Sequence, residues 1–148
     1  MKKYGKVAVL AVQKIHQDKN IYTIDAWTQA AIEIFTAQTT RHKKACPKST
    51  FLGLCEAGLI KGISSENIKN NLRKDTNKQY ALIAISILKS DPSFAERPLE
   101  LWKEIWNEHI KENPISHNFQ MDVVTALWNN DLINTATTSL VDDLVGVN

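Results

Sequence analysis

Apolar residues recur along this chain at the three- and four-residue intervals of an amphipathic helix, most regularly in the segment 27–35. The residues that would share its buried face are Trp27, Ala30, Ala31, Ile34 and Phe35. No segment alternates apolar and polar residues as a half-exposed strand does. We therefore predict an all-α protein, and the length favours one compact domain, residues 1–148, built as a bundle of six or seven helices.

Prolines mark where several of these helices begin and end. Pro47 and Pro98 stand where a first helical turn needs no N–H donor, and Pro92 and Pro114 follow helix ends. Together with the apolar pattern, they place helices at about 3–16, 23–35, 46–57, 76–90, 98–112 and 120–129, a short turn at 68–72, and a weak seventh helix at 138–145.

The segment CPKSTFLGLCEAGLIKGI, residues 46–63, combines the start, the packing face and the end of one helix. Ser49 and Thr50 can cap the early backbone donors or point outward beside them. The apolar stripe of this central helix consists of Phe51, Leu52, Leu54 and Cys55. Gly58 accepts the left-handed backbone conformation that closes a helix, so we expect a sharp turn there.

The pattern of this helix end returns 73 residues later, in DVVTALWNNDLI. Asp131 then stands at the position of Gly58, and aspartate is one of the few residues besides glycine that accept left-handed geometry. The matching apolar residues are Phe51, Leu54, Leu59 and Ile60 in the first copy and Val124, Leu127, Leu132 and Ile133 in the second. Because few positions match, a recurring way of ending a helix is the favoured explanation, and a true duplication of 51–60 as 124–133 is the alternative.

Composition places the chain among ordinary globular proteins, with 43% hydrophobic and 23% charged residues. The apolar run at 7–12 is too short for a secretory signal, and no stretch reaches the ~20 apolar residues of a membrane-spanning helix. Cys46 and Cys55 lie about 13 Å apart if both are on one helix, which is too far for a disulfide. We expect a reducing, cytoplasmic location and no membrane partner.

Charge is distributed unevenly along the chain. Residues 1–89 hold 15 of the 18 Lys and Arg but only 6 of the 16 Asp and Glu, a formal charge of +9, whereas residues 90–148 carry −7. Such an arrangement can attract the two halves of one molecule, attract two copies into a homodimer, or present a basic face to a polyanion. Attraction within one molecule is the favoured explanation.

The start of the central helix is the first candidate site. Its cationic side chains are Arg41, Lys43, Lys44 and Lys48. Free backbone N–H groups and the helix dipole already favour negative charge at such a position, and Ser49 and Thr50 add hydroxyl donors. A phosphate-bearing ligand or a nucleic acid is the partner that this combination favours.

Cys46 adds a catalytic alternative at the same place. A thiol at a helix start among cations is expected to be reactive, and His42 could act as its base. A cysteine nucleophile of the phosphatase type, however, needs an arginine where this chain has Leu52, and no residue that would orient the histidine is identifiable. Catalytic residues therefore stay unknown, and a small buried Cys46 is the favoured interpretation.

Metal and cofactor sites are not predicted. The four histidines are scattered and form no HExxH motif, and the two cysteines form no CxxC motif. The phosphate-loop patterns GxxxxGK[ST] and GxGxxG also have no match. We therefore expect no metal and no cofactor.

Four segments resemble a known protein family: WTQAAIEIF, CPKSTFLGLCEAGLIKGI, NKQYALIAISILK and QMDVVTALW. The chain is similar, over most of residues 4–133, to a family of small bacterial all-helical proteins with no assigned function. The residues that match in the central segment are Cys46, Pro47, Phe51, Leu54, Cys55, Glu56, Gly58 and Gly62. The resemblance implies a shared helical fold and assigns no catalytic residue.

These observations favour a non-catalytic binding module with an anion or polyanion site at the start of the central helix. One alternative is a protein–protein interaction module that uses the acidic helix 98–112, where Glu100, Glu104 and Glu108 share one face. Another is a small enzyme with Cys46 as its nucleophile.

Overall fold

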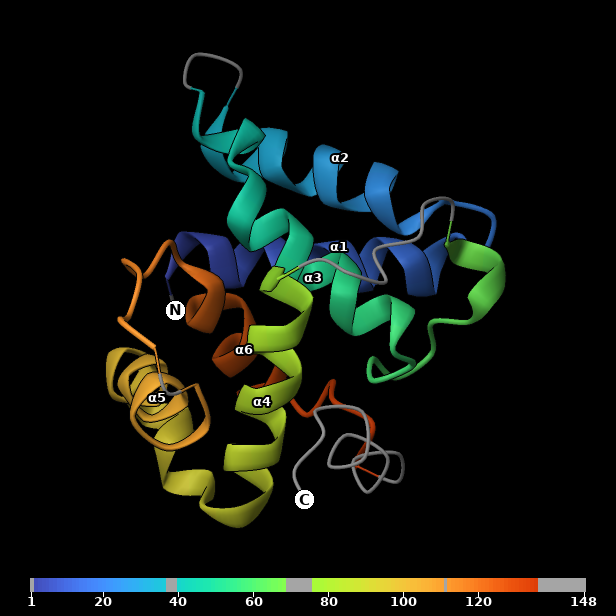
Figure 1. Cartoon of the computed structure of the whole chain (residues 1–148). Coiled ribbons are helices and arrows are strands. Elements are labelled where there is room, and N and C mark those ends of the chain that lie inside the picture. The colour runs from blue at the N-terminus through green and yellow to red at the C-terminus, as the bar shows by residue number, and fades with distance from the viewer. Residues whose placement is uncertain (1, 37–39, 69–75, 111, 136–148) are drawn as a thin grey trace.

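A computed structural model describes residues 2–36, 40–68, 76–110 and 112–135 (Figure 1). Its α-helices are α1 (Lys3–Gln17), α2 (Thr23–Phe35), α3 (Ala45–Glu56), α4 (Thr76–Ser90), α5 (Pro98–Glu104) and α6 (Gln120–Asn129). Short helical turns connect them: η1 (Arg41–Lys43), η2 (Ser65–Asn67), η3 (Pro92–Glu96) and η4 (Ile105–His109). In the part of the chain that the structure describes, the only β-type pairing is one isolated bridge, so the predicted all-α fold is confirmed.

The helix predicted at 98–112 is present from Pro98 to His109, but it ends earlier than expected and its second half is wound differently. Regular α-helix ends at Glu104, the turn η4 is a π-helix, and the backbone at Ile110 is extended. The N–H of Ile110 donates to the carbonyl oxygen of Ile105, at 2.9 Å, across this wider turn. Trp102 and Trp106 are both buried here with ring centroids 5.9 Å apart, so the packing of two large rings, which periodicity does not encode, accompanies the wider turn.

Two further sequence predictions cannot be compared with the structure. The weak seventh helix at 138–145 lies outside the described residues, and so does nearly all of the turn expected at 68–72.

The core is built from the apolar faces of all six α-helices. Helix α1 packs on α2 and on α6, and α3 packs on α4. Trp27 of α2 and Phe51 of α3 are almost fully buried, with ring centroids 5.3 Å apart. The apolar stripes expected from the sequence therefore face one another across a single core.

The ends of α3 and α6 have the same local geometry. Leu59 N–H donates to the Leu54 carbonyl at 3.1 Å, and Leu132 N–H donates to the Leu127 carbonyl at 3.0 Å. Gly58 and Asp131, the residues that close the two helices, have φ of 75° and 57°. Both helices thus end in the left-handed turn expected from the sequence.

Beyond these turns the two chain segments pair with each other. Ile60 and Ile133 form the isolated antiparallel bridge, Lys61 N–H donates to the Leu132 carbonyl at 2.9 Å, and Asn134 N–H donates to the Leu59 carbonyl at 2.7 Å. The similar segments 51–60 and 124–133 therefore lie side by side around a local two-fold axis.

The correspondence between the two halves of the chain, at a shift of 73 residues, extends to the helices that precede the segments 51–60 and 124–133. Helix α4 covers the residues of α1 shifted by the same 73 positions, and each is followed by an aspartate, Asp18 or Asp91, whose carboxylate accepts the N–H two residues on. Helix α5 with η4 then corresponds to α2, and α6 to α3. Since α1 packs on α6 and α4 on α3, each three-helix unit places its first helix against the third helix of the other.

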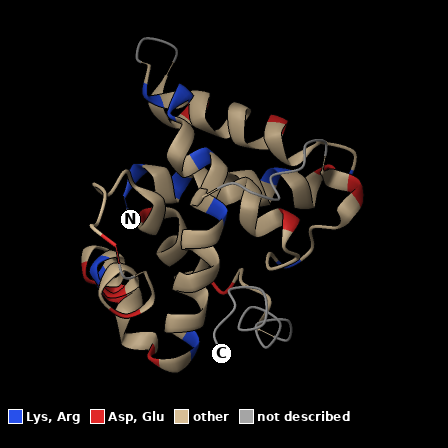
Figure 2. Ribbon diagram, in the orientation of Figure 1, with Lys and Arg blue, Asp and Glu red and all other residues tan. Residues whose placement is uncertain are grey.

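Most of the Lys and Arg positions lie on the unit formed by α1 to α3, and α5 carries the acidic residues Glu100 and Glu104 (Figure 2). Lys61 Nζ lies 2.9 Å from Asp131 Oδ1 and joins the two units where their helix ends pair. None of the described helices combines the length and the apolar character that crossing a membrane requires.

Candidate anion-binding site

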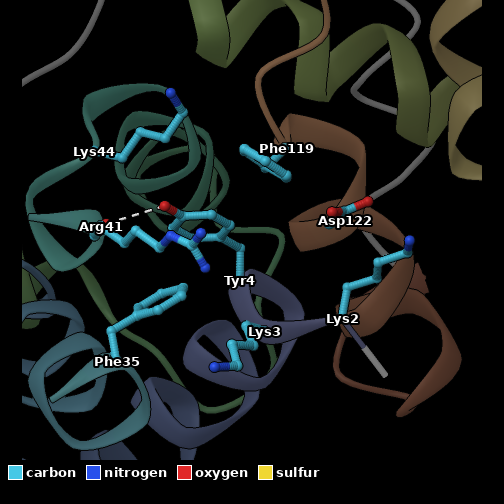
Figure 3. A pocket seen from close by; sticks show the side chains of 8 residues that line it. All are labelled: Lys2, Lys3, Tyr4, Phe35, Arg41, Lys44, Phe119 and Asp122. Carbon is cyan, nitrogen blue, oxygen red and sulfur yellow. Dashed lines mark hydrogen bonds between the residues drawn. The ribbon is translucent and has the colours of Figure 1, made fainter. Parts of the chain in front are cut away.

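A cavity of about 340 Å³ lies where the N-termini of α1, α3 and α6 come together (Figure 3). Its described lining residues are Lys2, Lys3, Tyr4, Phe35, Arg41, Lys44, Phe119 and Asp122. The first three come from the start of α1, Phe35 is the last residue of α2, and Arg41 and Lys44 belong to the connection between α2 and α3. The last two come from the start of α6. The site therefore depends on contact between the two three-helix units.

Three aromatic rings form one wall of the cavity. The ring of Tyr4 lies between those of Phe35 and Phe119, with centroid distances of 4.7 and 4.8 Å. The Tyr4 hydroxyl donates a hydrogen bond to the carbonyl oxygen of Arg41 at 3.0 Å (Figure 3). Burial raises the pKa of Tyr4, although the charge of Arg41 opposes the shift, so the hydroxyl stays protonated and keeps donating to this backbone position.

Phe119 has an unusual backbone conformation. Its φ of 68° is left-handed, a conformation that costs a bulky residue free energy, and it directly precedes α6. The side chain is 41% exposed although it is apolar. Its ring packs on that of Tyr4 and forms part of the edge of the cavity.

Two ammonium groups lie over the aromatic wall. Lys3 Nζ is 5.7 Å from the ring centroid of Phe35, and Lys44 Nζ is 5.7 Å from that of Phe119. Each distance is within the range of a cation–π interaction. The aromatic rings thus hold these ammonium groups near the cavity, where they can also meet an anion.

The N-termini of α1 and α3 lack a side-chain cap, whereas His117 caps the start of α6, because its Nε2 accepts the N–H of Met121 at 3.0 Å. The residues at the cap positions are Lys2 for α1, Lys44 for α3 and Phe119 for α6, and none of them makes a side-chain hydrogen bond to its helix. The first turns of α1 and α3 also lack acidic residues. Because free N–H groups give a helix start a partial positive charge, the uncapped starts of α1 and α3 and four cationic side chains make the cavity electropositive.

Asp122 is the single carboxylate among the described lining residues. It is only 7% exposed, and burial raises its pKa while the charge of Lys2 acts in the opposite direction. A neighbouring cation and a helix start therefore compensate part of its negative charge. The net charge of the lining stays positive.

The residues predicted from the sequence are only partly brought together here. Arg41 and Lys44 line the cavity, whereas Lys43 is exposed and does not. The others, which also lie outside the lining, are Cys46, Lys48, Ser49 and Thr50. Thr50 is fully buried, and its hydroxyl donates to the Cys46 carbonyl at 2.8 Å, so it is turned away from any ligand at the helix start.

Sequence reasoning missed six lining residues: Lys2, Lys3, Tyr4, Phe35, Phe119 and Asp122. The one local indication in the sequence is that Lys2, Lys3 and Lys6 place cations near the start of the first helix. Nothing local connects Phe119 or Asp122 to residues 2–44, since that contact arises from the packing of α1 on α6.

The described parts of the chain hold no cluster of metal-ligating side chains. Within residues 2–36, 40–68, 76–110 and 112–135, no three His, Cys, Asp or Glu side chains come together as a metal site would require. Cys46 is half-buried and Cys55 is buried, and both are free of disulfides. Burial raises the pKa of the Cys55 thiol well above its usual range, which makes it inert.

The fold and the cavity define an all-α protein of two interlocked three-helix units with a cationic, aromatic-walled cavity where they meet. The chain belongs to a family of unknown function (DUF6979), whose family model matches residues 1–134. The resemblance to a family without an assigned function is thereby confirmed. No curated protein and no solved structure matches the chain.

Proposed function

We propose that this protein binds a small ligand through a phosphate or carboxylate group held in the cavity between α1, α3 and α6, and that it does so without catalysing a reaction. One observation carries the proposal: four cationic side chains and three helix N-termini, two of them uncapped, surround a single concave site. The long helices α1, α3 and α6 each add a dipole to that site.

The energies involved are sufficient for specific binding. A helix dipole contributes about 0.3–1 kcal/mol toward an anion, and a charge-assisted hydrogen bond about 1.5–3 kcal/mol. Arg41 can also hold a carboxylate or phosphate with two donors. A few such contacts support an affinity in the micromolar to millimolar range.

A compact anion fits the structure better than a nucleic acid does. Nucleic acids are bound by cations spread along an extended surface, whereas here the cations converge on one cavity. The formal net charge of +2 also supplies little general attraction for a polyanion.

The two other candidate functions find less support. On the helix α5, Glu100 pairs with Lys103 at 3.5 Å and Glu104 is half-buried, so the acidic face offers a partner less free charge than a continuous helix over 98–112 would. For the enzyme hypothesis, the half-buried Cys46 does not line the cavity.

Calorimetric titration with inorganic phosphate tests the proposal. We expect saturable binding to the whole chain, and a loss of about tenfold or more in affinity for Lys44→Gln and for Arg41→Gln, because each removes a cation from the cavity. Lys43→Gln is the matched control, since it removes an exposed charge one residue from Lys44 that does not line the cavity. Equal losses in all three variants, or no binding by the parent protein, would contradict a defined site.

A further inference from the structure

A second cavity, of about 450 Å³, adjoins the first. Its described lining shares Lys2, Phe119 and Asp122 with the first cavity and adds Arg97, Pro98, Leu99 and His117. The added residues come from the start of α5 and from the chain just before α6. Phe119 therefore stands between two spaces that differ in the rest of their lining.

The second cavity is mostly apolar. Leu99 is 60% exposed, the most exposed of the large apolar side chains in the described residues, and Phe119 is 41% exposed. Leaving such side chains in water costs free energy, and in a cavity they are available to cover apolar parts of a ligand.

The two polar groups unique to this cavity are occupied elsewhere. Arg97 lies with its guanidinium carbon 4.7 Å from the ring centroid of Phe94 and donates to Ser93 Oγ at 3.0 Å. His117 Nε2 accepts the N–H of Met121 at 3.0 Å, and burial lowers the pKa of His117 to about 4, so its ring is neutral near pH 7. His117 therefore adds no charge to this lining near pH 7, and Arg97 adds one exposed guanidinium that contacts Phe94 and Ser93.

We infer that the ligand is an anionic amphiphile, bound as a single molecule, whose charged group occupies the cavity at Arg41 and Lys44 and whose apolar chain passes Phe119 to cover Leu99. This inference rests on the proposed anion binding and extends it to the rest of the ligand. It follows from the adjacency of a cationic and an apolar cavity that share one aromatic wall. Together they have the size and the mixed lining of small-molecule sites.

Straight-chain alkyl phosphates of increasing length, used below their micelle concentrations, test this assignment against inorganic phosphate. We expect affinity to rise about threefold to fourfold for each methylene that the second cavity covers, and to level off once the cavity is filled. Leu99→Ser should flatten this dependence on chain length and leave the affinity for inorganic phosphate unchanged, because Leu99 lines the second cavity and not the first.

Two control variants separate the contributions. Ile32→Ser removes an apolar side chain that is 42% exposed on α2 and lines neither cavity, so the dependence on chain length should stay as in the parent protein. Lys44→Gln should lower the affinity for inorganic phosphate and for each alkyl phosphate by a similar factor, so the dependence of affinity on chain length should stay unchanged.

The outcomes distinguish the two proposals. If inorganic phosphate does not bind, the proposed function fails and this inference fails with it. If phosphate binds but longer chains bind no better, or if Leu99→Ser leaves the dependence on chain length intact, the anion site stands and the amphiphile assignment falls. Binding to vesicles of phosphatidylglycerol without binding to monomeric alkyl phosphates would equally overturn it, since a membrane surface would then be the partner.

Discussion

Gly58 and Asp131 occupy the same place at the ends of α3 and α6, with φ of 75° and 57°. Nothing lies within 4 Å of the position that a Cβ would take at Gly58, so its requirement for glycine is conformational and not a matter of space. Asp131 tolerates the same conformation because its short polar side chain is one of the few that do.

We expect Gly58→Ala to lower the free energy of unfolding by about 1–2 kcal/mol, because alanine is strained in the left-handed region. Asp131→Gly should leave stability within about 0.5 kcal/mol of the parent, since its ion pair with Lys61 is exposed. Urea denaturation followed by circular dichroism measures both.

Gly58→Asn is the matched control. Because asparagine accepts the left-handed backbone conformation, this variant should lose less stability than Gly58→Ala. An alanine variant as stable as the parent would show that the turn does not depend on this residue.

His117 makes stability depend on pH. Burial lowers its pKa from 6.5 to about 4, so between these values the unfolded chain takes up a proton that the folded protein does not. The free energy of unfolding should therefore fall as the pH is lowered from 6.5 to about 4, by about 1–2 kcal/mol once solvent screening of this half-buried ring is allowed for.

Comparison with His117→Gln isolates this contribution. The variant should no longer lose stability as the pH is lowered from 6.5 to about 4. Burial raises the pKa of Asp122, so protonation of Asp122 favours the folded state at low pH, and it does so equally in both proteins. Unfolding curves at several pH values measure this difference. If the free energy of unfolding changes equally with pH in the two proteins, His117 is not the cause of the pH dependence.

At the scale of the elements, close packing of α3 on α4 depends on Gly53. A Cβ at Gly53 would lie 2.6 Å from Cβ and 2.9 Å from Cα of Lys78, so the backbones of the two helices would have to separate. Lys78 cannot turn aside easily, because its ammonium pairs at 2.6 Å with Glu56 and both side chains are only 13% exposed.

Gly53→Ala should therefore destabilise the protein by about 1–3 kcal/mol, even though alanine favours helix over glycine. Thermal unfolding with Ser49→Ala as the control in the same helix tests this, because Ser49 is only half-buried and its replacement should shift stability by no more than about 0.5 kcal/mol. If Gly53→Ala is more stable than the parent protein, α3 and α4 do not approach each other as closely at Gly53 as the structure shows.

At the scale of the whole molecule, the two three-helix units are alike in order and in their helix ends but not in chemistry. Lys44 before α3 corresponds to His117 before α6, and Cys46 corresponds to Phe119. At the positions that the two-fold axis relates to these, a neutral imidazole and a small thiol thus replace an ammonium and an aromatic ring. Among the described residues, the same backbone arrangement therefore carries different side chains at the two symmetry-related places.

Much of the fold could be predicted from the sequence because its determinants are local. Helix α6 was predicted with the bounds that the structure shows, and the left-handed turn at Gly58 follows from a residue type that prefers it. The prediction differs from the structure at η4, where the burial of Trp102 and Trp106 accompanies a wider turn. Periodicity identifies the face of a helix but not how its last turn is wound.

The site was predictable only in part, for the same reason. Arg41 and Lys44 stand close in sequence beside a helix start, and charge near a helix N-terminus is a local pattern. Lys2, Phe119 and Asp122 reach the cavity only because α1 packs on α6, an arrangement decided by which apolar faces exclude water together. The sequence by itself determined the helices, their turns and the sign of the charge, whereas tertiary packing alone decided that three helix starts from both units share one cavity.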